Sequence, residues 1–132
     1  MVVVLDCNIW ISLTINSEID LIADFSDGGI LIASCTTLKN EIIAVLNRPK
    51  LARFISGSAI DKVIELHDLV TASYKLDKIV RVTDDHKDDY LFALSVKCQA
   101  DYLVTGDKLL LDVVKYKDTD IISLAQFKGL IK

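Results

Sequence analysis

The chain has 132 residues, of which 52% are hydrophobic and 26% are charged, and its formal net charge is −4. This length suits one domain that buries its own core without disulfides or structural metal, and the composition excludes a disordered chain. The acidic balance argues against a protein that binds nucleic acid through a basic face, unless metal ions offset some of the carboxylates. We therefore expect residues 1–132 to form a single domain.

The first elements are a strand and a helix. Residues 2–5 form a short, mostly β-branched run that predicts a central strand buried on both faces. Apolar residues at spacings of three and four then predict one helix from Asn8 to about Phe25, ended by the glycines at 28–29. Because Asp6 interrupts the first apolar run, we expect no signal peptide and no membrane span, and therefore a cytoplasmic protein.

A second strand and two helical regions follow. Residues 30–33 predict a strand, and the polar residues at 34–37 are N-cap candidates for a helix through Leu46 that Pro49 terminates. Residues 51–74 predict one or two further helices.

The remaining elements continue the alternation. We expect a short strand at 80–82, a helix at 84–99, a strand at 102–105, a short helix at 108–114 and a last strand at 120–122. Strands that alternate with helical crossovers predict an α/β fold with a parallel sheet covered on both faces.

The three cysteines, Cys7, Cys35 and Cys98, are scattered and form no Cys-x-x-Cys pair. They have no histidine partner at zinc-ligand spacing, so we expect buried free thiols.

Two acidic residues stand where strands end. Asp6 directly follows the first strand, and Asp107 follows the strand at 102–105 and a glycine turn. The carboxyl ends of parallel strands meet at the sheet edge where α/β folds bind ligands. Capping or turn formation is the structural alternative for both residues.

Glu41 and Asp88 belong to predicted helices. Glu41 lies beside an apolar stripe, so its carboxylate is expected to face inward, which is rare for an acid that is neither paired nor metal-bound. Asp88 shares a face with apolar residues, but so does Asp89, and periodicity does not separate the two. His86 is expected to be exposed rather than catalytic.

Several carboxylates packed at one sheet edge repel one another unless they are protonated or neutralised by a metal. The sequence therefore suggests a divalent-metal site and a phosphoryl-transfer enzyme. Asn8 is placed to orient Asp6 or to cap the helix, and Thr105 adds a hydroxyl near the other strand end.

The order of these motifs resembles the PIN-domain family over nearly the whole chain. The motifs that carry this resemblance are Leu5-Asp6-x-Asn8, the inward Glu41, Asp88 followed by Ala93 and Ser95, and Val104-Thr105-Gly106-Asp107. The resemblance looks closest to small prokaryotic PIN proteins that are regarded as toxins of toxin-antitoxin modules.

The resemblance implies a three-layer α/β/α domain and a Mg²⁺- or Mn²⁺-dependent endoribonuclease with one or two ions. It carries the metal ligands onto Asp6, Glu41, Asp88 and Asp107, with Asn8 and Thr105 in support. It also implies an RNA substrate, a cognate antitoxin protein and a homodimer.

One position departs from the family pattern. Leu109 stands where many members have another acid, so a second ion would bind weakly or be held by Asp89 or Asp85.

Three basic residues, Arg48, Lys50 and Arg53, flank Pro49. They are candidates for guiding RNA, and an ordinary solvated charge cluster is the alternative.

Three alternative functions remain for the same acids. A phosphotransferase with an aspartyl nucleophile, of the haloacid-dehalogenase type, would want an acid where Asn8 stands. A receiver domain would pair acids at the end of the first strand, where Asp6 is alone. A catalytically degenerate binding module, in which the acids do not assemble, is the third alternative.

Overall fold

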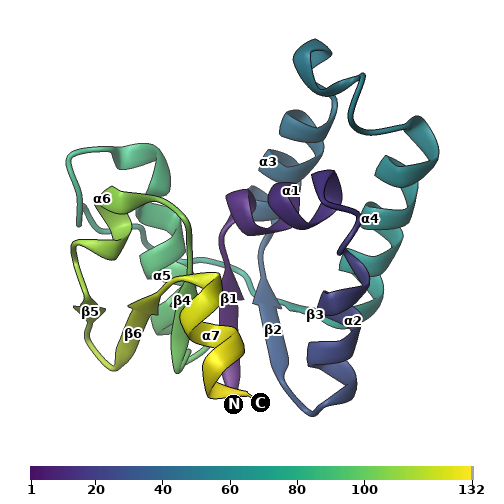
Figure 1. Cartoon of the computed structure of the whole chain (residues 1–132). Coiled ribbons are helices and arrows are strands. Elements are labelled where there is room, and N and C mark those ends of the chain that lie inside the picture. The colour runs from purple at the N-terminus through teal and green to yellow at the C-terminus, as the bar shows by residue number, and fades with distance from the viewer. Residues whose placement is uncertain (132) are drawn as a thin grey trace.

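The computed structural model describes residues 1–131, which form a six-stranded sheet with helices on both faces (Figure 1). The strand order is β3-β2-β1-β4-β6-β5, and all neighbours are parallel except β5 and β6, which form an antiparallel hairpin. The predicted three-layer α/β/α fold with a mostly parallel sheet is confirmed.

The strands are β1 (Val2–Leu5), β2 (Leu31–Ser34), β3 (Thr71–Ser73), β4 (Tyr102–Val104), β5 (Lys115–Tyr116) and β6 (Thr119–Ile122). The α-helices are α1 (Cys7–Ile15), α2 (Asp20–Asp27), α3 (Thr36–Leu46), α4 (Gly57–Val70), α5 (Asp89–Lys97), α6 (Lys108–Leu111) and α7 (Leu124–Leu130). Two short 3₁₀ helices, η1 (Pro49–Leu51) and η2 (His86–Asp88), precede α4 and α5.

The single helix predicted from Asn8 to Phe25 is two helices, α1 and α2. The chain turns at Ser17, which has a φ of 57°. The Glu18 amide donates to the Leu13 carbonyl and the Ser17 amide to the Thr14 carbonyl, a Schellman arrangement that ends α1. Because this motif normally carries glycine at the left-handed position, serine concealed the break in the sequence.

The sheet gains a strand where a helix was expected. The predicted helical region at 51–74 ends at Val70, and the next three residues form β3, which pairs with β2. β3 is short and lies at the edge of the sheet, so it needs no apolar pattern of its own.

The prediction of a strand at 80–82 was wrong, because those residues form no regular element. The strand predicted at 120–122 belongs to a hairpin whose turn contains Lys117 with a φ of 51°. α7 follows it and was not predicted; Ser123 and Gln126 form a capping box at its start.

The core surrounds β1, whose residues Val3, Val4 and Leu5 are fully buried. All three cysteines are buried and free, as predicted. No helix within residues 1–131 combines the length and the apolar character that crossing a membrane requires.

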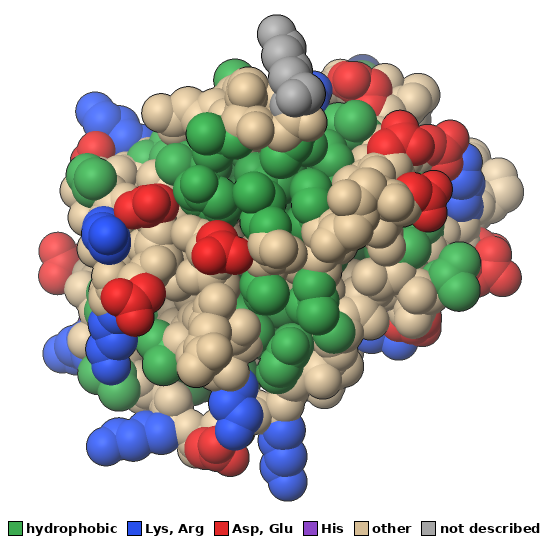
Figure 2. Space-filling view, turned by 90° about the horizontal axis from the view of Figure 1, so that it is seen from below, with side chains coloured by type: hydrophobic (Ala, Val, Ile, Leu, Met, Phe, Trp, Pro, Cys, Tyr) green, Lys and Arg blue, Asp and Glu red, His purple; other side chains and the backbone are tan. Residues whose placement is uncertain are grey.

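Seen from the end where both termini lie, the surface shows a group of hydrophobic side chains (Figure 2). Exposed apolar residues near this end of β1, β2 and α7 include Met1, Leu31 and Leu130. This surface lies at the amino ends of the parallel strands, away from the carboxyl ends at which Asp6 and Asp107 stand.

A buried histidine joins α4 to β2. The Nε2 of His67 lies 2.7 Å from the Ser34 hydroxyl, and its Nδ1 lies 3.0 Å from the Asp68 carboxylate. The Trp10 ring packs 5.3 Å from the imidazole, centroid to centroid. Burial lowers the pKa of His67 below its usual value, although Asp68 partly opposes this. The neutral ring can accept from Ser34 and donate to Asp68, so the fold favours the uncharged form.

We expect His67→Ala to lower the free energy of unfolding by about 3 kcal/mol at pH 7.5, through lost packing and an unpaired Ser34 hydroxyl. The unfolded chain binds a proton at His67 more readily than the folded chain, so the contribution of His67 is lost as the pH falls below about 6.5. The difference between wild type and variant in urea unfolding should therefore shrink at pH 5. An unchanged difference would show that His67 is not held neutral.

Candidate active site

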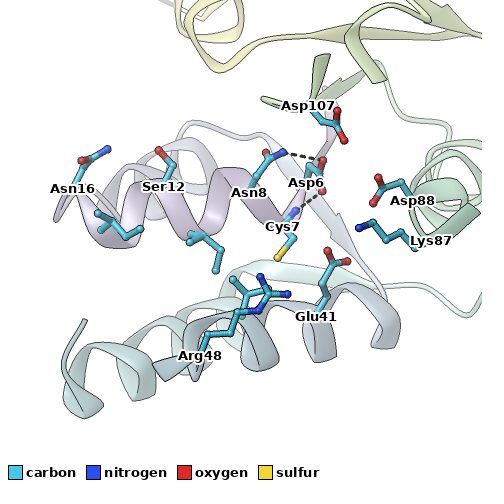
Figure 3. A pocket seen from close by; sticks show the side chains of 13 residues that line it. Asp6, Cys7, Asn8, Ser12, Asn16, Glu41, Arg48, Lys87, Asp88 and Asp107 are labelled. Atoms are coloured by element: carbon cyan, nitrogen blue, oxygen red, sulfur yellow. Dashed lines mark hydrogen bonds between the residues drawn. The ribbon is translucent and has the colours of Figure 1, made fainter. Parts of the chain in front are cut away.

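A pocket of about 480 Å³ opens at the carboxyl ends of β1 and β4 (Figure 3). All four carboxylates predicted as ligands line it, one from each of four separate parts of the chain. The complete lining is Asp6, Cys7, Asn8, Ile11, Ser12, Ile15, Asn16, Glu41, Val45, Arg48, Lys87, Asp88 and Asp107.

Asp6 both caps α1 and lines the pocket. Its Oδ1 accepts the Cys7 amide at 2.6 Å, and its Oδ2 accepts the Thr105 hydroxyl at 2.7 Å. The side chain is only 4% exposed. Burial, together with the negative charges of Glu41 and Asp107, raises the pKa of Asp6 to about 6 despite these hydrogen bonds.

Thr105 and Asn8 connect the two strand ends. The buried Thr105 hydroxyl donates to Asp6 and accepts the Asp107 amide at 3.0 Å. The Asn8 amide nitrogen lies 3.3 Å from Asp6 Oδ2, while its carbonyl oxygen accepts the Gly106 amide at 3.1 Å. These contacts fix the carboxylate of Asp6 relative to the turn that carries Asp107.

Asp107 is the N-cap of α6. Its Oδ1 accepts the Leu109 amide at 2.9 Å, and the side chain is half-buried. Capping and pocket lining are thus compatible for Asp107 and Asp6, because a short carboxylate can use one oxygen to cap the helix while the other points elsewhere.

Glu41 enters the pocket from α3. The Tyr90 hydroxyl donates to its Oε2 at 2.5 Å, and this contact joins α3 to α5. Burial and the neighbouring carboxylates raise the pKa of Tyr90, so its hydroxyl remains a donor. Sequence reasoning missed Tyr90, because nothing local indicates that a helical tyrosine contacts an acid 49 positions earlier.

Asp88 lines the pocket and Asp89 does not, a difference that periodicity alone did not indicate. Burial, together with the charges of Asp6, Asp85, Glu41 and Asp107, raises the pKa of Asp88 to about 6. Asp89 Oδ1 instead accepts the amide and hydroxyl of Thr83 at 3.1 and 3.2 Å. Although burial opposes it, these hydrogen bonds lower the pKa of Asp89, whose carboxylate holds the preceding loop.

The three basic residues that were predicted to guide RNA also differ in whether they line the pocket. Arg48 lines the pocket, whereas Lys50 and Arg53 do not. The guanidinium carbon of Arg53 lies 5.1 Å from the centre of the Phe54 ring. Lys87, which was not predicted, extends into the pocket near Asp88 and Glu41 (Figure 3). His86 is exposed, as expected.

The pocket suits a hard divalent cation in its chemistry. Four carboxylate residues supply oxygen ligands, and burial together with the neighbouring carboxylates raises the pKa of Asp6 and of Asp88. Within residues 1–131, however, no three acidic, histidine or cysteine side chains are close enough to hold an ion as they stand. An ion held by three or more of these carboxylates would therefore require their side chains to move closer together.

A protein-family model described as PIN domain matches residues 2–109 of the chain. The chain belongs to the PIN-domain family. Members of this family are generally nucleases. A search of curated proteins and a search of solved structures each returned no match.

The match to the PIN domain includes all four pocket acids and ends inside α6. The hairpin of β5 and β6 and the helix α7 lie beyond it, and they complete one side of the sheet next to β4. The PIN-domain assignment therefore rests on the part of the chain that builds the pocket.

Proposed function

We propose that this PIN-domain protein is a divalent-metal-dependent endoribonuclease that hydrolyses RNA phosphodiester bonds. The observation that carries the proposal is the meeting of Asp6, Glu41, Asp88 and Asp107 in one pocket at the carboxyl edge of the sheet. Buried acids with raised pKa values in a cleft are typical of functional sites.

In this proposal the four carboxylates hold one or two Mg²⁺ or Mn²⁺ ions. A bound ion supplies Lewis-acid activation of water and offsets the charge of the phosphate. Thr105 and Asn8 orient Asp6, and Tyr90 orients Glu41. No histidine lines the pocket in the described part of the chain, so proton removal is assigned to water and carboxylates.

Arg48 and Lys87 give the pocket its only cationic side chains among the described residues. They reduce the repulsion between the acidic pocket and an approaching phosphate backbone. We assign RNA contact to Arg48; Lys50 and Arg53 lie outside the pocket.

A non-catalytic binding module is the second candidate. The observation in its favour is that no three metal-binding side chains in residues 1–131 are yet close enough to share an ion. Calorimetric titration separates the two candidates, because the nuclease must bind Mn²⁺ and a degenerate module need not. The aspartyl phosphotransferase and receiver alternatives gain nothing, since Asn8 is engaged with Gly106 and Asp6 has no acidic neighbour on its strand.

The decisive experiment is cleavage of a single-stranded RNA with Mn²⁺ or with EDTA, using wild type, Asp107→Asn and the control Asp118→Asn. Asp118 is an exposed acid in the hairpin turn and does not line the pocket. Cleavage should require Mn²⁺, persist in Asp118→Asn and fail in Asp107→Asn. Equal products in all samples would reject the proposal.

The toxin role, a cognate antitoxin, homodimer formation and a cytoplasmic location are proposals that rest on family resemblance. Growth arrest on expression in a bacterial host, relieved by Asp107→Asn, would support the toxin role. Light scattering of the purified protein tests the dimer, for which the exposed Met1, Leu31 and Leu130 offer apolar surface.

Tyr90→Phe is expected to weaken Mn²⁺ binding by about tenfold, because Glu41 loses the hydroxyl that orients its carboxylate. The phenylalanine ring keeps the packing of the buried tyrosine, so thermal stability without metal should change little. Calorimetric titration measures the affinity, and Tyr74→Phe is the control because Tyr74 does not line the pocket. Equal affinities for both variants would show that Tyr90 does not position Glu41.

A further inference from the structure

The pocket extends beyond the carboxylates into a groove between α1 and α3. Along α1, Cys7, Ile11 and Ile15 form one row of pocket-lining residues at spacings of four, and Asn8, Ser12 and Asn16 form the next row. Figure 3 shows Asn8, Ser12 and Asn16 placed successively along the helix, away from Asp6. Each row begins at the acidic end of the pocket and runs away from it.

The opposite wall comes from α3 and the residues after it. Glu41, Val45 and Arg48 follow at spacings of four and three and line the same pocket. Arg48 is exposed and forms no ion pair within residues 1–131, although the pocket contains four carboxylates. In Figure 3 its side chain extends toward Cys7, on the wall opposite Asn8 and Ser12.

The floor of this groove is apolar and open to solvent. Ile11 and Val45 are partly buried, and Ile15 is 36% exposed, although other residues of α1 are fully buried in the core. An apolar floor with polar side chains at one edge and a cation on the opposite wall matches the surfaces of a nucleotide, whose base has flat apolar faces and a polar edge, and whose phosphate is anionic. The pocket volume of about 480 Å³ also lies in the range of small-molecule sites.

We propose that this α1–α3 groove holds the base of an unpaired nucleotide next to the scissile phosphate. Ile11, Ile15 and Val45 lie under the base, Ser12 and Asn16 contact its edge, and Arg48 binds the flanking phosphate. The side chains of Ser12 and Asn16 are exposed, and neither forms a hydrogen bond within residues 1–131, so they can bind a ligand. This inference rests on the proposed function and names the residues that would contact the base and the flanking phosphate.

The physical reason for a single strand is access. A base in an RNA duplex is stacked and paired, so its face cannot reach an apolar floor, whereas an unpaired base can be turned out. From Asn8 to Asn16, α1 rises by about 12 Å, which gives room for more than the reacting phosphate alone.

Binding tests the groove without reference to cleavage. We would measure fluorescence anisotropy of a labelled RNA octamer, alone or in a blunt duplex, with Mn²⁺ and proteins carrying Asp107→Asn. The single strand should bind about tenfold more tightly than the duplex. Adding Arg48→Ala should weaken single-strand binding about tenfold, and adding Ile15→Ala about fivefold.

Arg53→Ala is the matched control, because Arg53 is a nearby exposed arginine outside the pocket. It should leave binding within about twofold of the background. Equal binding of duplex and single strand, or unchanged binding in both the Arg48 and Ile15 variants, would overturn the proposal that the groove binds an unpaired base.

Mapping of cleavage sites on a mixed-sequence RNA tests the base contacts. The double variant Ser12→Ala, Asn16→Ala should change the base preference beside the cut relative to wild type, and an identical distribution of sites would reject these contacts. If the wild type cleaves no RNA, the proposed function fails, while the anisotropy series still decides whether the groove binds a single strand.

Discussion

Replacing Asp6 with asparagine is expected to reduce RNA cleavage by at least about a hundredfold and, at the same time, to stabilise the metal-free protein. The loss of activity follows because Asp6 is the most deeply buried of the four pocket acids and is fixed by both Thr105 and Cys7. Removing a metal ligand should reduce activity at least as much as removing a residue that only orients a metal ligand.

The gain in stability follows from the raised pKa. The folded protein holds the proton of Asp6 up to a pH of about 6, against an ordinary value of 3.8. The folded state therefore binds more protons than the unfolded state between these values, and wild type loses stability as the pH rises through this window. The full difference corresponds to about 3 kcal/mol, and we expect a gain of about 2 kcal/mol because the amide also loses charge-assisted hydrogen bonds.

Urea unfolding at pH 4 and pH 7.5 without metal measures this effect as the difference between Asp6→Asn and wild type. The titration of His67 is present in both proteins and cancels. The difference should be small at pH 4 and reach its full value above pH 6, while Asp118→Asn matches wild type at both values. If Asp6→Asn cleaved RNA as fast as wild type, the catalytic role of Asp6 would be contradicted. If Asp6→Asn were less stable than wild type at pH 7.5, burial of the Asp6 charge would not be costly.

The sequence was sufficient to predict the central strands and the acids at their ends. β1 and β4 are buried on both faces and so have uninterrupted apolar runs, and Asp6 and Asp107 are conspicuous because they end such runs. The placement of Glu41 beside an apolar stripe also led to the pocket. These signals are local and depend on burial alone.

Features that depend on contacts between distant segments were missed. The hydrogen bond between Tyr90 of α5 and Glu41 of α3, and the entry of Lys87 of η2 into the pocket, join residues that are more than 40 positions apart in the chain. The distinction between Asp88 and Asp89 likewise depends on Thr83, which captures one of the two carboxylates. No periodicity in one helix contains this information.

Secondary structure was misjudged where the usual signal residue was absent. Ser17 takes the left-handed conformation that glycine normally marks, so α1 and α2 were merged. β3 was missed because an edge strand of three residues leaves too short a pattern to recognise. Neither Ser17 nor β3 lines the pocket, so these errors did not alter the choice of candidate ligands.

Mn²⁺ is expected to raise the melting temperature, and the increase should be much larger at pH 8 than at pH 5. At pH 5 the carboxyls of Asp6 and Asp88 are mostly protonated, because their pKa values are raised to about 6, and protons compete with the metal. At pH 8 both are ionised and repel each other, and a bound divalent ion relieves this repulsion. A metal concentration one hundred times the dissociation constant stabilises by about 2.7 kcal/mol, or about 10 °C for a chain of this size.

Differential scanning calorimetry with and without Mn²⁺ at the two pH values measures the shift, and Asp88→Asn should reduce it whereas Asp118→Asn should not. Isothermal titration at pH 6 in buffers of different ionisation enthalpy should also show proton release on Mn²⁺ binding, since carboxyls that are partly protonated must ionise to act as ligands. A melting temperature that millimolar Mn²⁺ leaves unchanged at pH 8 would mean that the four carboxylates do not rotate together around an ion. The four acids in the pocket would then serve another function than metal binding, and the proposed nuclease mechanism would be rejected.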